Sequence, residues 1–476
     1  MGSALPRHDC GADPVASGTR TGVECPVVPL AIASVPAVAD PAAKPVPGPP
    51  PAGARWSGRQ YVPGELSGVA VLCLVFIPYA LGHYLSCLLR TVNAILAPQL
   101  MAAAALTPAN LGLLTSAYFF AFALAQLPVG LALDRYGPRR VQFVMLLVAS
   151  VGTLAFAGSQ TFTQMLAART LMGLGLAGCF MAAVKAVSTW IAPAKLPSVQ
   201  GYLIAAGGLG AASATLPVRL FLQLADWRWL FIWLAAGCAI AGLLILLLAP
   251  TPPAAPHKRF DRKALLDVYR HPVFRETAML VLIPHTVFFG LQGLWIGRWL
   301  TDVGRFPEQS VAWLLYLGMA AVIFGAISVG MVTEWAARRG ADAITVAGVG
   351  VSLFLVVQCG FLLGFKPSFA LLSVLFTLIG TITGIEYTIV AQAMPPALTG
   401  RASTCLNLLI FTGAFIVQAG FGEIVGLWQP DASHHYPASA YQAAFGAVVL
   451  LQLPGIAWFV WRRRRVVARN TVESAF

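Results

Sequence analysis

Twelve long apolar segments follow one another between residues 67 and 461. Each has at least the ~20 residues that a helix needs to cross the hydrocarbon core of a bilayer. Lipid offers no hydrogen bonds to the backbone, so each segment must satisfy its own amides as a helix. The segments are 67–96, 108–133, 139–158, 164–191, 199–222, 228–249, 275–301, 309–332, 343–364, 367–394, 402–427 and 438–461. The sequence therefore predicts an all-α polytopic membrane protein with twelve transmembrane helices.

The distribution of charge predicts how this chain is oriented. Only 10% of the residues are charged, against about 25% in soluble domains. The basic residues gather in the loops that follow even-numbered segments and at the C-terminus: Arg135, Arg139, Arg140, Lys195, Lys258, Arg259, Arg262, Lys263, Arg270, Arg338, Arg339, Arg401 and Arg462 to Arg465. The positive-inside rule then places both termini in the cytoplasm. We expect the protein to span a cell membrane, the bacterial inner membrane, with lipid around it.

Composition divides the chain into five regions. Residues 1–63 are rich in proline and alanine and are predicted to be a disordered cytoplasmic tail. Residues 64–249 and 275–461 would each form a six-helix bundle. Residues 250–274 would be a basic cytoplasmic linker and residues 462–476 a basic cytoplasmic tail. The net charge of +13 is thus explained by loops, and no basic domain is left that would bind nucleic acid.

A short charged loop separates the second and third segments. It reads Gly130-Leu-Ala-Leu-Asp134-Arg135-Tyr136-Gly137-Pro138-Arg139-Arg140. Its glycines permit a tight reversal, and its carboxylate can bind an arginine or cap a helix. A weaker copy follows the eighth segment: Gly330-Met-Val-Thr-Glu334, then Arg338, Arg339 and Gly340. The repetition indicates two related halves.

The loop at residues 130–140 closely resembles the signature loop between helices 2 and 3 of the major facilitator superfamily of transporters. Two further stretches are similar to that family: Arg169-Thr-Leu-Met-Gly173-Leu-Gly175 and Asp226-Trp-Arg-Trp229. The resemblance covers all twelve segments and leaves out the tail. It implies two pseudo-symmetric six-helix bundles around a central cavity, working by alternating access. It also implies that Asp134 and the neighbouring arginines join the inner ends of helices 2 and 11 in one state of the cycle.

Arg90 is the candidate substrate ligand. Arg90-Thr-Val-Asn93 in the first segment is similar to the anion:cation symporter branch of the family, whose arginine contacts a substrate carboxylate. A guanidinium suits this role because it grips a carboxylate with two hydrogen bonds and keeps its charge. The alternative is an Arg90 that extends to the membrane surface. Arg169, in the fourth segment, would face the cavity or serve packing.

Proton coupling has two candidates. Several of the resembling symporters carry a carboxylate two turns after the helix 4 arginine, where this chain has Leu176. Glu386, near the middle of the tenth segment, could replace it, or it could pack beside a neighbouring helix. His285, after Pro284 in the seventh segment, could move protons near neutral pH or be a satisfied buried histidine.

Further polar residues would complete the site. Arg298, with Gln292 and Trp295 on a similar face, could line the cavity from the seventh segment. Asn407 could bind substrate or join two helices. Lys185 is expected to extend to the membrane surface. The intramembrane positives outnumber the carboxylates, which favours an anionic substrate.

The sequence thus predicts a secondary transporter that takes up a small organic anion, a carboxylate, with protons. The alternatives are an exporter of a drug or metabolite by proton antiport and a non-transporting sensor. We find no Walker loop, metal-ligand spacing or nucleophile–base pair in the sequence, so we expect no enzyme, no metal and no cofactor. We expect a monomer.

Overall fold

The computed structural model describes residues 67–191, 196–250, 262–394 and 396–473, and within these ranges it contains helices and turns but no strand. Eleven helical stretches there are long and apolar enough to cross a membrane. Every predicted segment overlaps one of them, and we number the segments as spans 1 to 12 in chain order. The tail at residues 1–63 and residues 251–261 of the linker lie outside the described residues.

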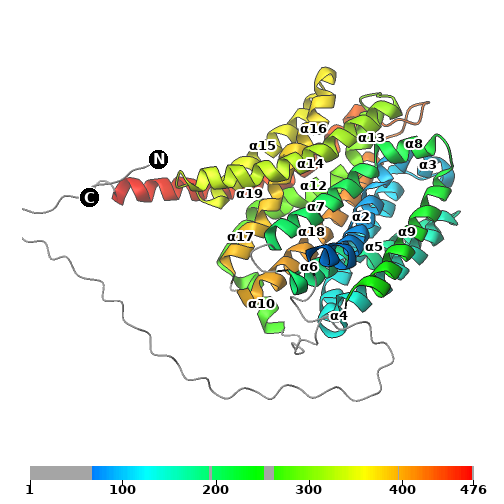
Figure 1. Cartoon of the computed structure of the whole chain (residues 1–476). Helices are drawn as coiled ribbons and strands as arrows, with labels where there is room; N and C mark the ends of the chain where they lie inside the picture. The colour runs from blue at the N-terminus through cyan, green and yellow to red at the C-terminus, as the bar shows by residue number, and fades with distance from the viewer. Residues whose placement is uncertain (1–66, 192–195, 251–261, 395, 474–476) are drawn as a thin grey trace, which may run out of the picture. The chain divides into compact units, whose positions relative to one another are not determined.

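The helices of the first half are arranged as follows (Figure 1). Span 1 comprises α1 (Gly68–Val71), a π-turn (Leu72–Phe76), α2 (Ile77–Thr91) and α3 (Asn93–Ala104); spans 2 and 3 form α4 (Pro108–Ala157); span 4 comprises α5 (Phe162–Leu176) and α6 (Cys179–Trp190); span 5 comprises α7 (Leu196–Ser213) and α8 (Leu216–Leu222); span 6 is α9 (Trp227–Leu248).

The second half begins after α10 (Arg262–Arg270), which lies in the predicted linker. Span 7 comprises α11 (Pro272–Thr277), a π-turn (Ala278–Leu282), α12 (Ile283–Gln292) and α13 (Trp295–Asp302); span 8 is α14 (Glu308–Ala337); span 9 is α15 (Ala343–Leu363); span 10 comprises α16 (Phe369–Gly380), a 3-10 turn (Thr381–Gly384) and α17 (Ile385–Ala393); span 11 is α18 (Pro396–Val425); span 12 is α19 (Ala438–Glu473).

α4 accounts for the difference between eleven stretches and twelve spans. A continuous helix of 50 residues would be about 75 Å long, more than twice the hydrocarbon thickness. Gly137 interrupts it with φ 79° and ψ 161°, a conformation that glycine adopts without strain. Spans 2 and 3 are therefore separate, as predicted, and reverse direction at the charged loop.

The faint repeat in the sequence corresponds to a repeated turn. Gly340, after span 8, has φ 78°, nearly the value at Gly137 after span 2. Glu334 lies one turn from Arg338 and pairs with it at 3.7 Å on an exposed surface. The two loops thus share a left-handed glycine, although the second places it three residues later relative to its carboxylate.

Glycines let the helices approach closely, as the pattern after Arg169 predicts. A side chain at Gly173 would lie 2.4 Å from the Tyr118 carbonyl oxygen, and one at Gly175 would lie 2.3 Å from the Ala149 amide. α5 therefore packs backbone to backbone against α4. Such small-residue contacts are how helices associate in lipid.

The two halves meet where α4 crosses α18. Gly112 and Gly422 face each other there, and a side chain at Gly422 would lie 2.6 Å from the Pro108 carbonyl oxygen. The Trp295 ring closes the same crossing, because its Nε1 donates to the Gln418 carbonyl oxygen at 3.0 Å. Gly112 lies near the start of span 2 and Gly422 near the end of span 11. We call the end that holds the loop at residues 130–140 the motif end. This crossing therefore lies at the end opposite to the motif end.

Candidate functional site

The site is built around a buried ionisable pair between α12 and α17. The Nδ1 atom of His285 lies 2.6 Å from the Oε1 atom of Glu386, and the Glu386 side chain is 0% exposed. The second carboxylate oxygen of Glu386 has no hydrogen-bond partner among the described residues. A buried charge costs much free energy unless it is paired. A histidine and a carboxylate at this distance can share one proton or exchange it.

Local breaks in the helices position both members of the pair. The π-turn at Ala278–Leu282 comes directly before Pro284, where the proline ring cannot continue a regular helix, and His285 follows. The 3-10 turn at Thr381–Gly384 ends just before Glu386, which lies in the first turn of α17. Both side chains therefore project from points where the backbone is irregular.

An aromatic ring connects this pair to the first half of the chain. The imidazole of His285 stacks on the Phe289 ring with centroids 5.0 Å apart and planes 22° apart. The Cζ atom of Arg90, from α2, lies 5.1 Å from the centroid of the same ring. Two sequence candidates on different halves thus share one side chain that the sequence analysis did not single out.

Arg90 is half-buried, and no carboxylate among the described residues pairs with it. Its Nη2 atom lies 3.8 Å from the Cys87 sulfur, which in turn lies 3.8 Å from Nε2 of His83. Arg90 therefore contacts a thiol and a ring, both weak partners for a guanidinium. The N–H donors of Arg90 are therefore available to a bound anion.

Arg169 is a second guanidinium without a carboxylate partner in the described part of the chain. It is fully buried, donates from Nη1 to the Leu89 carbonyl oxygen at 2.8 Å, and lies 5.4 Å from the Tyr118 ring centroid. Its Nε and Nη2 atoms have no partner among the described residues. Arg169 thus holds the backbone beside Arg90 and adds positive charge near it.

The remaining polar candidates divide between the site and the crossing of the two halves. Asn407 accepts a hydrogen bond from the Tyr387 hydroxyl, next to Glu386. Asn93 is buried and donates to Thr115 at 3.3 Å. Gln292 contacts the Met319 sulfur at 3.8 Å, and Trp295 is buried in the crossing of α4 and α18. Asn407 therefore belongs to the Glu386 region, whereas Trp295 serves the contact between halves.

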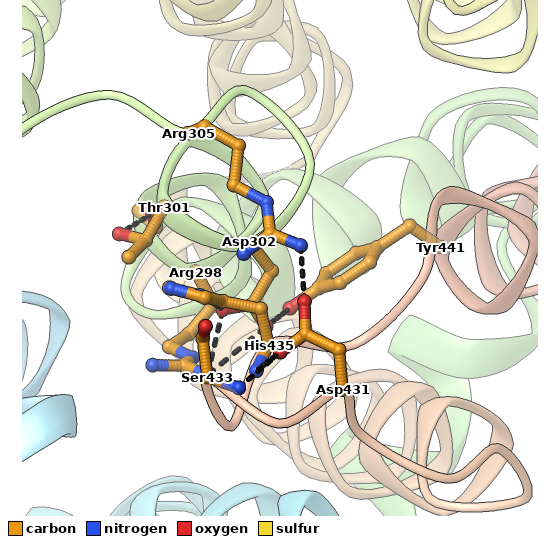
Figure 2. Close-up of polar contacts among 9 residues, drawn as sticks. Arg298, Thr301, Asp302, Arg305, Asp431, Ser433, His435 and Tyr441 are labelled. Atoms are coloured by element: carbon orange, nitrogen blue, oxygen red, sulfur yellow. Dashed lines mark hydrogen bonds and ion pairs between the residues drawn. The ribbon is translucent and has the colours of Figure 1, made fainter.

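Arg298 lies in a different polar cluster (Figure 2). It pairs with Asp302 at 2.9 Å, and Asp302 also accepts hydrogen bonds from the Tyr441 hydroxyl at 2.7 Å and contacts His435 Nδ1 at 3.1 Å. The predicted seventh segment ended at residue 301, which is why Asp302 was overlooked. The charge of Arg298 is therefore already balanced within the protein.

The same cluster continues to the loop between α18 and α19. Arg305 pairs with Asp431 at 2.5 Å, and the backbone amides of His435 and Ser433 also donate to that carboxylate (Figure 2). The Arg305 hydrogen bond, helped by these amides, lowers the pKa of Asp431 to about 2. The cluster fixes this loop against the end of α13.

The motif end has different partners from those the resemblance implied. Asp134 pairs with Lys185 of α6, and Lys185 also donates to the Leu133 carbonyl oxygen at 2.9 Å. Arg139 donates to the Leu246 carbonyl oxygen at the end of α9 at 2.9 Å. Lys185 is partly exposed and reaches the charged motif loop, so its extension to the membrane surface stays a prediction, now with Asp134 as its partner. In this structure Asp134 pairs within its own half, not with span 11.

The other motif residues are exposed or half-buried. The Cζ atom of Arg135 lies 5.2 Å from the Tyr136 ring centroid, Arg140 is exposed, and Gly130 and Gly330 have little or nothing packed on them. In the described ranges no group of three His, Cys, Asp or Glu residues could hold a metal ion.

Comparison with known proteins identifies the family. The model of the Major Facilitator Superfamily matches residues 79–418. The chain is 29% identical over 213 residues to a probable sulfoacetate transporter of Cupriavidus necator, covering 44% of this chain and 47% of that protein. It is 28% identical over 270 residues to a gentisate transporter of Corynebacterium glutamicum, covering 52% and 59%. The matches thus span about half the length of these curated relatives.

A solved structure has the same fold. The inward-facing, unoccupied form of a bacterial homologue of the human lysosomal transporter Spinster superposes with a TM-score of 0.69 at 17% identity, covering 84% of this chain and 98% of that one.

Proposed function

The chain belongs to the major facilitator superfamily of secondary membrane transporters, and from this premise we propose that it takes up a small organic anion, a carboxylate or sulfonate, together with protons. The observation that carries the proposal is Arg90. It is a half-buried guanidinium inside a span, and it has no carboxylate partner in the part of the chain described. It lies over the Phe289 ring, on which His285 of the His285–Glu386 pair also stacks.

Charge balance within the spans supports an anionic substrate. Arg298 is balanced by Asp302, and Arg219 by Glu308 at 2.5 Å. Arg90 and Arg169 have no such partner among the described residues. Intramembrane charges are costly and are retained where they serve substrate or ion pathways. An anion that reaches Arg90 would supply the missing counter-charge.

Three known relatives point to the same class. Their names specify sulfoacetate, gentisate and D-galactonate, all of which are organic acids. Planar carboxylates and sulfonates both present oxygens that a guanidinium binds with two hydrogen bonds. In our proposal Arg90 holds the acid group, Arg169 adds field strength, and Asn93, Gln292 and Asn407 contribute polar contacts in other states of the cycle.

The structure fits one end state of alternating access. The crossing at Gly112 and Gly422 and the ion pair between Arg219 and Glu308 join the halves at the end opposite to the motif loop. With the predicted orientation, that end faces outward, so the protein would be closed to the outside. The substrate would then leave toward the cytoplasm.

Transport by purified protein in liposomes tests the proposal. Labelled sulfoacetate, gentisate and D-galactonate are offered outside, with and without an imposed gradient that is acidic outside. We expect one of them to accumulate above its equilibrium level only with the gradient. Arg90→Ala should abolish that accumulation. Arg305→Ala removes an arginine that is already paired with Asp431 in the loop between α18 and α19, and it should retain the accumulation.

Two results would overturn the proposal. Accumulation of neutral or cationic solutes in preference to all organic acids would remove the anion assignment. Normal uptake by Arg90→Ala would remove Arg90 from the substrate site.

A further inference from the structure

We propose that Phe289 is the residue that couples anion binding to proton binding, an inference that rests on the proposed transport of an organic anion with protons. The sequence predicted no role for this ring. It is half-buried in α12, one helical turn from His285, and it lies where the two halves meet beside Arg90.

The geometry places a guanidinium and an imidazole against one ring. Arg90 lies 5.1 Å from the Phe289 centroid, and the His285 imidazole is stacked on that ring at 5.0 Å. The other titratable groups facing His285 are Glu386 at 2.6 Å and the Tyr387 ring at 6.0 Å, both from α17. Arg90, from α2, faces His285 only across Phe289.

An aromatic ring attracts a cation through the negative charge density of its face, and this attraction grows where water is excluded. In the anion-free protein Arg90 occupies that interaction. Protonation of the His285–Glu386 pair adds a second positive charge beside the same ring, so the two cations disfavour each other. A guanidinium without an anion and a protonated pair therefore oppose each other across this ring.

Anion binding reverses this relation. A carboxylate or sulfonate on Arg90 neutralises the guanidinium and draws it from the ring. The ring can then stabilise the protonated pair, with the proton held between His285 Nδ1 and Glu386 Oε1. Thermodynamic linkage makes the effect reciprocal: a protonated pair strengthens anion binding by the same factor.

Neighbouring Phe288 provides a matched control. It is adjacent in sequence and equally aromatic. It packs against Phe354 at 6.3 Å and Phe376 at 6.2 Å and touches Phe289 edge-on at 5.8 Å, whereas the Arg90 guanidinium lies against the Phe289 ring. Phe288→Leu therefore removes a buried ring from α12 and leaves the shared ring in place. Any general effect of losing a phenyl group from this helix should appear in both variants.

The experiment measures the affinity for sulfoacetate or gentisate, whichever wild-type liposomes accumulate, at pH values from 5.5 to 8.5, about the range in which histidine titrates. We expect wild-type affinity to strengthen at least about fivefold toward low pH. Phe289→Leu and Phe289→Met should flatten this dependence to less than about twofold and bind fewer protons per anion. Phe289→Tyr should restore it, and Phe288→Leu should behave as wild type.

Exchange of labelled for unlabelled anion without a pH gradient shows that each variant is folded and competent. If exchange-competent Phe289→Leu or Phe289→Met keeps the wild-type pH dependence, Phe289 does not couple the two events. If wild-type affinity and uptake are themselves independent of pH, proton coupling is wrong and the inference is lost with it. If wild type is coupled and the Phe289 variants keep full coupling, the transport proposal stands and only the role of Phe289 is rejected.

Discussion

His285 and Glu386 face each other across α12 and α17 at hydrogen-bond distance, with Nδ1 and Oε1 2.6 Å apart and both side chains almost completely buried. Neither has another ionic partner in the described part of the chain. The pair comes from residues 101 positions apart in sequence, on the two spans of the second half that are interrupted by irregular turns. A pair of this kind can carry one proton without leaving an isolated charge in the membrane.

Glu386→Gln should uncouple transport from protons. The amide keeps the size of the side chain but cannot take up and release a proton. We expect accumulation driven by the pH gradient to fall roughly tenfold or more, with anion exchange largely retained. Uptake and exchange in liposomes measure the two separately.

The matched control is Glu423→Gln, which changes an exposed carboxylate near the end of α18. It should leave gradient-driven accumulation unchanged. Equal losses in both variants, or full accumulation by Glu386→Gln, would show that the proton is carried elsewhere.

Gly422→Val should open the end at which the halves meet. The new side chain would lie 2.6 Å from the Pro108 carbonyl oxygen and 3.0 Å from the Trp295 ring. Overpacking of this kind costs about 1–3 kcal/mol, and here it acts only on the closed state. A cysteine introduced at Ala109 should therefore react several times faster with a membrane-impermeant thiol reagent.

Gly420→Val is the control for this prediction. Gly420 lies on the same helix, but a side chain there would meet nothing within 4 Å. It should leave the labelling rate at Ala109→Cys unchanged. Slower labelling in Gly422→Val would mean that the crossing does not close this end.

The loop between α18 and α19 should resist acid until low pH. The pKa of Asp431 is lowered to about 2 from its ordinary value of 3.8 by Arg305 and two backbone amides. A depressed carboxyl pKa stabilises the folded loop above the unfolded pKa, and this contribution is lost as the pH falls from about 4 through 2. NMR of the labelled Asp431 carboxyl should show this titration, and Arg305→Ala should move its pKa up toward 3.8. An unchanged pKa in Arg305→Ala would show that the ion pair is absent in solution.

The spans could be predicted from sequence because lipid permits few alternatives. Hydrophobic length and backbone satisfaction determine that each segment is a helix, and these are local properties. The turn at Gly137 was likewise predictable, since charges and glycines cannot continue a helix through hydrocarbon. The six-and-six division remains a prediction, because residues 251–261 of its linker lie outside the described residues.

The site was only partly predictable because its partners are distant in sequence. Arg90, His285 and Glu386 were each recognisable as costly charges within a span. That Glu386 pairs with His285, or that Arg298 is balanced by Asp302, depends on how the helices pack. Phe289 was missed because a phenylalanine in an apolar span carries no signal of its own, although its spacing of one turn from His285 was visible.

Asp134→Asn and Lys185→Met together test what the motif loop does. In this structure the two residues pair within one half, with side chains 56% and 37% exposed. An exposed ion pair contributes about 0–1 kcal/mol, so its loss alone should slow transport less than about fivefold.

If Asp134 also binds the motif end of α18 in another state, Asp134→Asn should slow turnover roughly tenfold or more with nearly unchanged anion affinity, while Lys185→Met has a mild effect. Initial rates and binding constants for both single variants and the double variant separate these cases. Equal, non-additive effects of the two single variants would confine Asp134 to its pairing with Lys185.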